Sequence, residues 1–553
     1  MRIKQDYVNV GSEQRPQLIH FRTAGTGPAL LMLHASPMSS AALLPFIGVA
    51  AEFTTVFAPD TPGYGWSDPL REPSGDLSGY VAALHSFTER LGLDSFGLYG
   101  TATGAQIAIE FGKTHGARVD YLILDNAAHF TDEERESIVS GYFPDLTADV
   151  TGSHLTKIWS VARDQCVFFP WHQTTPETRL PAGGVNTAVV HQMAMEYLQA
   201  GKDYDRAYRA AFANEKMERV QPITVPVIIM RWQGSILKSY TDRFDSIKWP
   251  DNFTMLHCGP TREQRLEAFR SIFTERIPHS HSRNCHTSRS DKYGIAGKGF
   301  LDLAAGQCHY FSAGDRTLPP LLALHDIGAS QRSLAARAAS LSRRYHVFVP
   351  DLPGHGLSYQ PEEGQRGIDA IVDALVELVD SLRWNRFRIL ADKDSAAIAV
   401  ELAARAGQSV HEIKLLNPID YAALAGEWEI ERFCHDFGPD AEGAHFLKTW
   451  HLLRDRQLFW PWYEADADHA LSGQANLDAD YLNERVTEFW QAYPVLNELR
   501  RQVLNYPLAA HLDRLGCPVD LCVTATDPLA EIGRRSLQSC NRNRGSGRTM
   551  HTT

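Results

Sequence analysis

The stretch FGLYGTATGAQIAIEFG, residues 96–112, decides the fold of this chain. Its apolar start predicts a strand, its small residues predict a sharp turn, and the apolar spacing that follows predicts a helix. Gly100 and Gly104 bracket the turn at the spacing of the G-x-S-x-G motif, in which the middle residue is a nucleophile. The middle residue here is Ala102, and a methyl group cannot attack a substrate.

The second half of the chain carries the same strand–turn–helix element at residues 388–402, RILADKDSAAIAVEL, with Lys393 at the middle of the turn. Three further segments recur at a constant separation of 291 positions, which indicates a tandem duplication. They are LLMLH and LLALH, ending at His34 and His325, PDTPGYGWS and PDLPGHGLS, starting at Pro59 and Pro350, and GSHLTKIWSVARDQCVFFPW and GAHFLKTWHLLRDRQLFWPW, starting at Gly152 and Gly443.

Length and composition limit the classes of protein to consider. A chain of 553 residues is too long for one ordinary core, so two or more domains are expected. A formal net charge of −12 argues against a general nucleic-acid binder or an anionic-membrane binder. The start, MRIKQDYVNV, lacks the apolar region of a signal peptide, and no apolar run is long enough to span a bilayer. Eight scattered cysteines predict reduced thiols in a cytoplasmic protein.

Between the two halves lies PHSHSRNCHTSRSDKYG, residues 278–294, which is polar and has no apolar periodicity. This composition predicts a linker. Its imidazoles and thiol, at His279, His281, Cys285 and His286, are of the types that bind metals. Because no ligand cage is evident, a solvated linker is favoured, and no metal or cofactor is expected in the chain.

In the first half, apolar strand candidates alternate with helix-patterned runs. Near-continuous apolar strands separated by helices predict an α/β fold with a mostly parallel sheet covered on both faces. A polar-aromatic helical segment at about 128–222 predicts a cap over the carboxyl ends of the strands. The strands are expected at 29–34, 55–59, 96–100, 121–124, 225–231 and 253–257, and helices between them at 78–91 and 104–112.

The second half repeats this order. We therefore expect two tandem domains, at residues 1–277 and 295–535, with the second cap at about 420–515 and contact between the halves. Residues 536–553 are rich in Arg, Asn, Ser and Gly and contain no apolar run. This composition predicts a disordered tail, and hence a second copy that lacks its last strand.

Three segments in order, LLMLHASPMSS, VFAPDTPGYGWSDP and LYGTATGAQIAIEF, resemble the α/β-hydrolase fold family with a helical cap. The resemblance is to the branch of haloalkane dehalogenases, epoxide hydrolases and small esterases. It covers nearly all of residues 15–277 and most of 296–530. It implies two domains of that fold and a small-molecule substrate, but the fold hosts many chemistries, so it does not identify the reaction.

The resemblance also implies a place for each member of a catalytic triad. The nucleophile position is Ala102, and the hydroxyls of Thr101 and Thr103 beside it are expected to line the pocket instead. The usual acid position, near Gly234–Ser235, has no carboxylate. Asp125 is an alternative acid used by some members of the family, and a structural role in capping backbone N–H groups is equally open.

The histidine position of the family aligns with Pro260, and His257 lies three residues too early. We interpret His257 as a packing residue of the last strand. The loop His34–Ala35–Ser36–Pro37 matches the oxyanion-hole loop of the family, whose backbone N–H groups bind a carbonyl oxygen or a carboxylate. His34 is expected to buttress this loop or to take part in proton transfer. Asp60 is expected to be structural.

In the second copy, Lys393 lies between Asp392 and Asp394. Neighbouring carboxylates keep a lysine charged, which favours an inert ion pair over a nucleophile. Asp527 matches the acid position of the family, and His325 matches His34. The second copy is therefore predicted to be catalytically degenerate as well.

The segments that match best between the halves lie in the caps. Two hypotheses are open for them. In the first, His154 and Arg163 reach over the elbow and bind an anionic or carbonyl substrate, with Trp159 and Trp171 at its sides. In the second, these side chains pack the cap and Arg163 forms a structural ion pair. The counterparts in the second copy are His445, Trp450, Arg454 and Trp462.

Two functions follow from these assignments. The first is an enzyme of non-standard mechanism, acting on a small organic ester or carbonyl compound with His34, Asp125 and His154 as proton-transfer groups. The second is a pseudo-hydrolase that keeps the pocket, has lost the chemistry, and binds a small molecule or serves as a scaffold. The retained oxyanion loop favours the first function, and Ala102 favours the second.

Overall fold

The computed structural model describes residues 2–12, 14–72, 75–181, 183–277, 297–434, 437–538 and 548–552. The chain divides into two compact units, one of residues 1–147 and 154–293 and the other of residues 148–153 and 294–553. Each unit is described by itself. The expected linker, 278–294, with its candidate metal ligands, lies outside the described residues.

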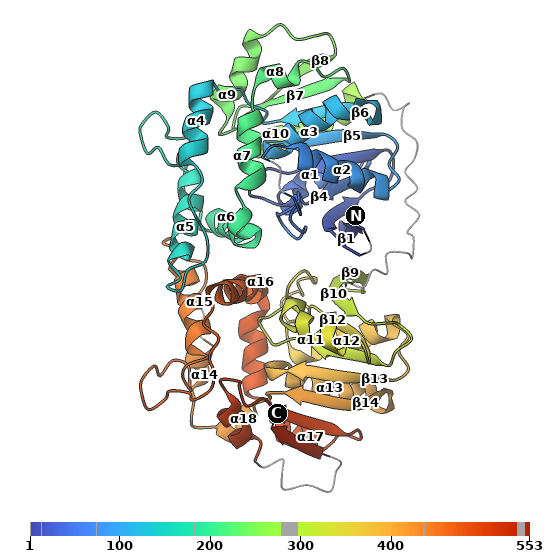
Figure 1. Cartoon of the computed structure of the whole chain (residues 1–553), viewed down its shortest axis with the longest axis vertical. Helices are drawn as coiled ribbons and strands as arrows, with labels where there is room; N and C mark the ends of the chain where they lie inside the picture. Colours follow the sequence, from blue (N-terminus) through green and yellow to red (C-terminus); the bar gives the residue numbers. More distant parts are fainter. Residues whose placement is uncertain are drawn as a thin grey trace. The chain divides into compact units, whose positions relative to one another are not determined.

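The first unit is built on an eight-stranded sheet whose order is β1-β2-β4-β3-β5-β6-β7-β8 (Figure 1). The pairs β1/β2 and β2/β4 are antiparallel, and all later pairs are parallel. The sequence predicts the parallel strands but not β1 and β2, which alternate weakly. The strands are Lys4–Asn9, Leu18–Ala24, Ala29–Leu33, Thr55–Pro59, Phe96–Thr101, Val119–Asp125, Val227–Trp232 and Phe253–Cys258, for β1 to β8.

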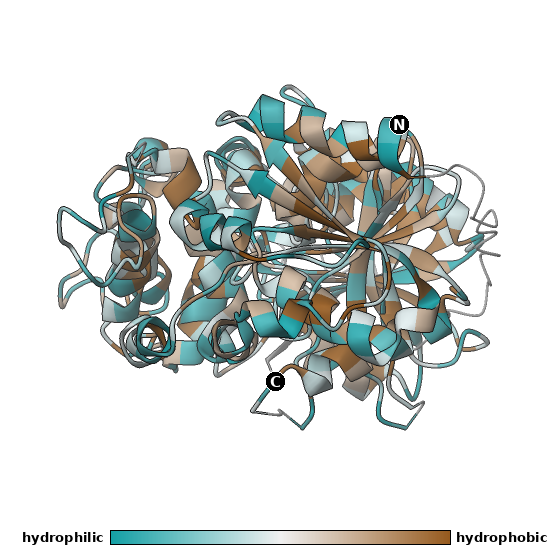
Figure 2. Cartoon of the chain, turned by 90° about the horizontal axis from the view of Figure 1, so that it is seen from above, coloured by the Kyte–Doolittle hydropathy of each residue, from teal (hydrophilic) through white to brown (hydrophobic). Residues whose placement is uncertain are grey.

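Helices cover both faces of this sheet. Helix α2 (Ser78–Arg90) packs beside α3 (Thr103–Thr114), and α1 (Leu44–Ala50) packs beside α10 (Arg262–Ser271). Each pair closes its own apolar cluster against the strands, which are coloured as hydrophobic along most of their length in Figure 2. Because strands β3 to β6 are buried on both faces, they read as continuous apolar runs in the sequence.

Five helices lie between β6 and β7, in the segment expected to form a cap. We call this segment the insertion, residues 126–226. Its helices are α4 (Asp132–Gly141), α5 (Ser153–Gln165), α6 (Thr187–Ala200), α7 (Arg206–Asn214) and α8 (Met217–Val220), followed after β7 by α9 (Lys238–Thr241).

The second unit repeats the order, β9-β10-β12-β11-β13-β14-β15-β16. Strands β11 to β14 start and end 291 positions after β3 to β6, so the duplication holds residue by residue through the centre of the sheet. The strands are Gly297–Asp302, Gln307–Ala313, Pro320–Leu324, His346–Pro350, Phe387–Asp392, Val410–Leu416, Val519–Val523 and Arg548–Thr552, for β9 to β16. The helices are Ala335–Leu341, Ile368–Ser381, Ala396–Ala406, Ile430–Phe433, Ala444–Asp455, Ala479–Leu504, Leu508–Leu512 and Ala530–Ser536, for α11 to α18.

Two expectations about the end of the chain are wrong. Residues 536–553 are not all a disordered tail, because β16 pairs in parallel with β15 over Arg548–Thr552. The second sheet therefore has its last strand. A strand at the sheet edge needs backbone pairing with only one neighbour, so a polar sequence can fill this position without an apolar run.

The two insertions differ at one break. Helix α6 ends at Gly201, whose φ is 68°, a conformation that glycine adopts without strain. The matching region of the second copy has Ala492, and one helix, α16, continues through it for 26 residues even though Pro494 lies inside it. Gly201 thus ends α6 where the second copy continues its helix, and residues 201–205 separate α6 from α7.

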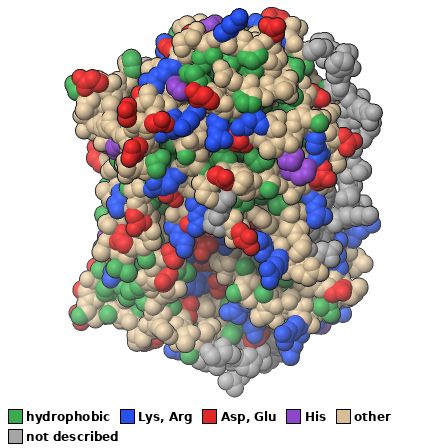
Figure 3. Space-filling model, turned by 45° about the horizontal axis from the view of Figure 1, so that its top comes forward, with side chains coloured by type: hydrophobic (Ala, Val, Ile, Leu, Met, Phe, Trp, Pro, Cys, Tyr) green, Lys and Arg blue, Asp and Glu red, His purple; other side chains and the backbone are tan. Residues whose placement is uncertain are grey.

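No helix in the described part of the chain is long and apolar enough to cross a membrane. On the face shown in Figure 3, basic and acidic side chains are interspersed rather than gathered by sign. A cytoplasmic location stays a prediction.

Candidate functional site

The turn between β5 and α3 has the backbone of the predicted elbow. Ala102 has φ 47° and ψ −113°, a strained conformation for a residue with a Cβ atom. A Cβ on Gly100 would lie 2.3 Å from the Gly104 carbonyl oxygen, and one on Gly104 would lie 2.4 Å from the Leu33 carbonyl oxygen. The close approach of β3, β5 and α3 therefore requires both glycines, as the sequence indicates.

A cavity of about 200 Å³ lies above Ala102. It is closed by the elbow, the oxyanion loop and the insertion, and most of its wall is apolar. Ala35, Thr101, Ala102 and Thr103 are the predicted site residues that line it. The other lining residues are Ser36, Pro37, Met38, Asn126, Tyr142, Gln165, Phe169, Met193, Tyr208, Ala211, Phe212, Glu215, Ile236 and Leu237.

Five polar atoms of the lining residues are buried and have no hydrogen-bond partner: Ser36 Oγ, Thr103 Oγ1, Asn126 Oδ1, Gln165 Oε1 and Glu215 Oε2. Thr103 and Glu215 are only 2% and 3% exposed. A buried polar atom without a partner destabilises a fold, so such atoms are rare unless a ligand or ordered water satisfies them. Five of them around one cavity indicate a binding site.

Burial favours the neutral form of the Glu215 carboxyl group. Burial raises its pKa well above the usual range, and the charge of Arg135 only partly opposes this. In its neutral form Glu215 carries a proton that it can donate to a ligand oxygen. Nothing in the sequence marks this residue, because it follows α7 in a polar stretch, NEKMER.

Gln165 is held by two tyrosines on the far side of the cavity. Its Nε2 donates to the hydroxyls of Tyr197, at 2.7 Å, and Tyr142, at 3.2 Å. Tyr208 in turn donates to the Tyr142 hydroxyl, at 3.2 Å. Because both amide hydrogens of Gln165 are engaged, the amide orientation is fixed and Oε1 remains as an acceptor.

His34 does not line the cavity. Its Nδ1 donates to the Ala35 carbonyl at 2.9 Å, and its Nε2 accepts from the Thr61 N–H at 2.8 Å. Burial lowers its pKa, so the ring is neutral with both nitrogens engaged. This placement favours the buttress role over proton transfer.

Asp125 is also engaged away from the cavity. Its Oδ2 accepts from the Tyr99 hydroxyl at 2.9 Å and from Arg265 Nη2 at 2.6 Å. The Arg265 guanidinium lies over the ring of Trp232, 4.4 Å from its centroid. An ion pair of this kind fixes α10 against the sheet, which favours the structural alternative for Asp125.

The cap pair is not brought to the elbow. His154 is buried in α5 outside the cavity lining, and Arg163 is 48% exposed. Arg163 Nη1 lies 3.3 Å from Oδ1 of its chain neighbour Asp164. The first hypothesis for the cap, in which His154 and Arg163 bind the substrate, has no geometric support. The residue of α5 that does reach the cavity is Gln165.

Trp159 is buried and does not line the cavity, whereas Trp171 donates from Nε1 to the Tyr142 carbonyl at 3.0 Å. Trp171 thus supports a lining residue from behind. The expected packing of His257 is wrong, because its side chain is exposed on β8. Pro260, at the histidine position of the family, is exposed as well, and no histidine is among the lining residues of the described chain.

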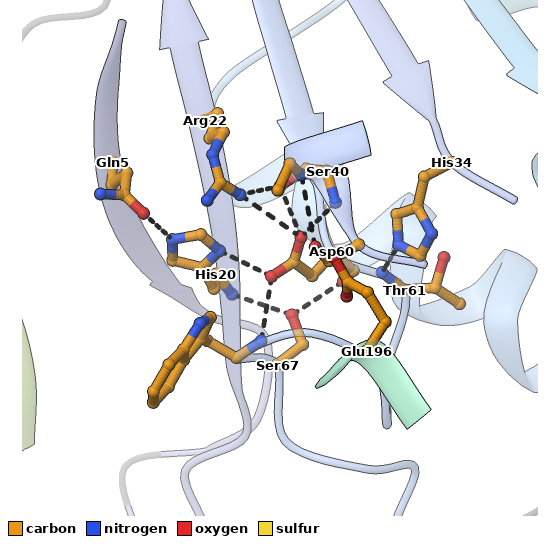
Figure 4. Close-up of polar contacts among 12 residues, drawn as sticks. Gln5, His20, Arg22, His34, Ser40, Asp60, Thr61, Ser67 and Glu196 are labelled. Carbon is orange, nitrogen blue, oxygen red and sulfur yellow. Dashed lines mark hydrogen bonds and ion pairs between the residues drawn. The ribbon is translucent and has the colours of Figure 1, made fainter. Parts of the chain in front are cut away.

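A second polar cluster surrounds Asp60 beneath the loop (Figure 4). His20 Nδ1 lies 2.7 Å from Asp60 Oδ2, and the N–H groups of Ser40 and Trp66 donate to the same carboxylate at 2.7 and 3.0 Å. These contacts hold its pKa far below the usual range against the cost of burial. The structural role expected for Asp60 fits this geometry, and the same contacts recur around Asp351.

Glu196 of α6 lies beside this cluster and is 4% exposed. It accepts from Ser39 Oγ at 3.1 Å and has no cationic partner within ion-pair distance in the described chain. Burial, with a contribution from the charge of Asp60, raises its pKa to about 7. The second copy has Glu488 in this place, accepting from Ser330 Oγ and paired with Arg485.

The elbow of the second copy is charged. Lys393 has φ 49°, close to the φ of Ala102, and its Nζ lies 3.4 Å from Asp527 Oδ2. The nearby carboxylates raise the pKa of Lys393 despite its burial, which favours the inert ion pair over a nucleophile. Asp394 accepts from the Tyr421 hydroxyl at 2.7 Å and lies 3.6 Å from Arg456 Nη2.

The other counterparts repeat the first copy. His325 donates to the Asp326 carbonyl and accepts from the Leu352 N–H, as His34 does with its neighbours. His445 is buried, and burial lowers its pKa to about 4. Arg454 pairs with Asp455 at 3.5 Å. Among the described residues, no group of three or more His, Cys, Asp or Glu side chains is placed to hold a metal ion.

Residues 28–154 match the family model described as alpha/beta hydrolase fold. This segment has the alpha/beta hydrolase fold. The matched segment contains β3 to β6, the oxyanion loop and the elbow, and the sheet order agrees with it. The family resemblance drawn from the sequence is confirmed, and so is the class of fold.

Curated relatives match only part of the chain. The magnesium-chelatase 30 kDa subunit of Rhodobacter capsulatus is 38% identical over 85 residues, which are 15% of this chain and 30% of that subunit. The pimeloyl-[acyl-carrier protein] methyl ester esterase of Shewanella sp. (strain MR-7) is 43% identical over 70 residues, 13% of this chain and 25% of the esterase. The match therefore spans a third or less of the length of these relatives, and it does not extend to their activities.

Among solved structures, the epoxide hydrolase VrEH1 from Vigna radiata is 15% identical, with a TM-score of 0.37, over 49% of this chain and 95% of that one. This likeness is too distant to bear on function.

Proposed function

We propose that the first copy binds a small uncharged molecule in the cavity above Ala102 and forms no covalent intermediate with it. The observation that carries this proposal is the set of five unpaired polar atoms in a wall that offers no histidine. A covalent route needs a nucleophile and a base within hydrogen-bond reach. The elbow carries a methyl group, and His34 has both ring nitrogens engaged elsewhere.

The charge of the wall limits the ligand. The lining residues include no lysine, arginine or histidine, and burial raises the pKa of their one carboxyl group, on Glu215, which favours its neutral form. An ion transferred from water into such a cavity loses its hydration and gains no counterion, which is costly. An uncharged ligand is therefore favoured, in line with the ester or carbonyl compound expected from the sequence.

The unpaired atoms also suggest which groups the ligand carries. Neutral Glu215 and the Thr103 hydroxyl can donate to a carbonyl oxygen. Gln165 and Asn126 present carbonyl oxygens that accept from a hydroxyl or an N–H group. The cavity, about 200 Å³, is smaller than the roughly 300–1,000 Å³ of sites for drug-sized molecules. A small hydroxy ester, hydroxy ketone or amide fits these limits. The esterase relative, which by its name acts on a methyl ester, supports the choice of an ester.

Ligand-observed NMR and calorimetry on the full chain test this proposal with three matched probes. Methyl 3-hydroxybutyrate should bind, ethyl acetate should bind more weakly because it lacks the hydroxyl, and the 3-hydroxybutyrate anion should not bind. Substitution Gln165→Leu should weaken binding of the hydroxy ester about tenfold, the value of one lost hydrogen bond in a buried site. The exposed control Thr156→Val, on the same helix α5, should not.

Mass spectrometry after incubation should show no adduct and no hydrolysis. If the hydroxy ester is hydrolysed, and Glu215→Gln abolishes the turnover, Glu215 is a proton donor in an enzyme and the binding-only proposal is wrong. Preferred binding of the anion would equally contradict it.

A further inference from the structure

In the second copy the chain places a carboxylate of its own at the elbow. Asp326 follows His325 in the loop after β11, and its Oδ1 accepts two backbone hydrogen bonds. One comes from the Ile327 N–H at 2.9 Å, and the other comes from the Asp394 N–H at 3.1 Å. The two donors lie 67 positions apart and belong to different loops, so the carboxylate oxygen joins two separate parts of the fold.

These donors have exact equivalents in the first copy. Ile327 and Asp394 lie 291 positions after Ser36 and Thr103, which both line the cavity above Ala102. The residue equivalent to Asp326 is Ala35, whose methyl group cannot accept a hydrogen bond. The first copy therefore has the same loop pair without a side-chain oxygen of its own at this position.

The surroundings of Asp326 act on its charge in opposite directions. Burial and the charge of Asp394 raise its pKa, whereas the positive charges of Lys393 and Arg456 partly oppose this rise. Lys393 itself is shared with Asp527, at 3.4 Å. Two N–H donors aimed at one oxygen are an arrangement that binds a carboxylate or carbonyl oxygen.

We propose that the Ile327 and Asp394 N–H groups form a carboxylate-binding site that the chain fills with its own Asp326. While Asp326 is in place, the second copy binds no external ligand at its elbow. When its carboxylate is removed, a free monocarboxylate of acetate size takes the same two hydrogen bonds. This inference stands on the second copy alone and does not depend on the function proposed for the first.

Acetate is the probe, and the full chain is the sample. At pH 8, which lies above the pKa of about 7 to which burial raises Asp326, ¹³C-acetate is titrated into the wild type, Asp326→Ala and Asp326→Asn at constant ionic strength. Asp326→Asn is the matched control, because its amide oxygen can still accept both N–H groups. We expect Asp326→Ala to bind acetate at least about tenfold more tightly than the other two.

Equal acetate binding by all three proteins, or no gain in Asp326→Ala, overturns the proposal. If Asp326→Ala is less stable than the wild type, its melting temperature provides a second test. Acetate should then raise the melting temperature of that variant more than chloride does, and Asp326→Ser, whose hydroxyl is too short to reach the Asp394 N–H group, should respond in the same way. A variant that melts at the same temperature in acetate and in chloride contradicts the inference.

Discussion

The two elbows share a backbone and differ in every side chain that matters for chemistry. Ala102 and Lys393 have φ values of 47° and 49°, although neither is a nucleophile of the usual kind for this turn. A strained conformation persists only where the surrounding structure imposes it. The close packing of β3, β5 and α3 does so in the first copy. The elbow backbone is thus a property of the fold, and it is present even where the usual nucleophile is missing.

What fills the space above each turn is different. In the first copy, Ala35, Ala102 and Thr103 leave an uncharged cavity. In the second copy the same three positions are Asp326, Lys393 and Asp394, and all of them are paired within the chain. Duplication kept two sheets, but we infer that only one copy kept an open site.

The largest effect is expected when the first copy is given the aspartate of the second. In Ala35→Asp, the new carboxylate can accept from the Ser36 and Thr103 N–H groups and bring a charge into an uncharged cavity. Binding of methyl 3-hydroxybutyrate should fall about 100-fold, or about 3 kcal/mol, as measured by calorimetry. Ala42→Asp adds the same charge at an exposed position and should change nothing. Unchanged binding in Ala35→Asp would mean that the loop does not contact the ligand.

The two buried glutamates give the next comparison. Glu488 pairs with Arg485, whereas Glu196 has no cation in reach among the described residues. Glu488→Gln should destabilise the second unit by about 3 kcal/mol, because Arg485 is left buried without its counterion. Glu196→Gln should cost nothing at pH 8. Thermal unfolding resolved into the two units measures both, and equal losses would contradict the difference.

Glu196 also predicts a pH dependence for the first unit. Its pKa in the folded state is raised from 4.5 to about 7, so folding favours its protonated form. The stabilisation is fully present below pH 4.5 and is lost as the pH rises through 7, amounting to about 3 kcal/mol at most. Unfolding of the first unit should therefore become easier from pH 5 to pH 8. In Glu196→Gln the stability of the first unit should depend less on pH. An unchanged pH dependence would mean that another group causes it.

Substitution of Thr103 should have a smaller effect, which raises the stability of the protein but weakens ligand binding. Its hydroxyl is buried and unpaired, so Thr103→Val should raise the stability of the ligand-free protein by about 1 kcal/mol. Binding of the hydroxy ester should weaken several-fold, because a donor to its carbonyl oxygen is lost. Calorimetry and thermal unfolding on the same sample measure the two changes. A stability loss would mean that an ordered water already satisfies this hydroxyl.

The sequence predicts the parallel strands to within two residues and the elbow to the residue, because both depend on local pattern and on the need for Gly100 and Gly104. It does not predict the cavity wall. Glu215 and Gln165 line the same cavity as Thr103 only because of how the insertion folds over the elbow. No local periodicity in the sequence encodes that fold. The edge strand β16 is missed for a related reason, since its pairing with β15 is a long-range contact made by a polar segment.

Restoring the nucleophile alone should have the smallest effect. Ala102→Ser places a hydroxyl at the middle of the elbow, but a serine needs a base to take its proton, and no histidine lines the cavity in the described chain. Hydrolysis of p-nitrophenyl acetate by Ala102→Ser should stay within about threefold of the wild type, and Lys393→Ser should behave alike. A burst of p-nitrophenol from Ala102→Ser, with an acetyl group found on that serine, would show that a base reaches this corner. The two copies would then differ in chemistry as well as in whether a ligand can reach the elbow.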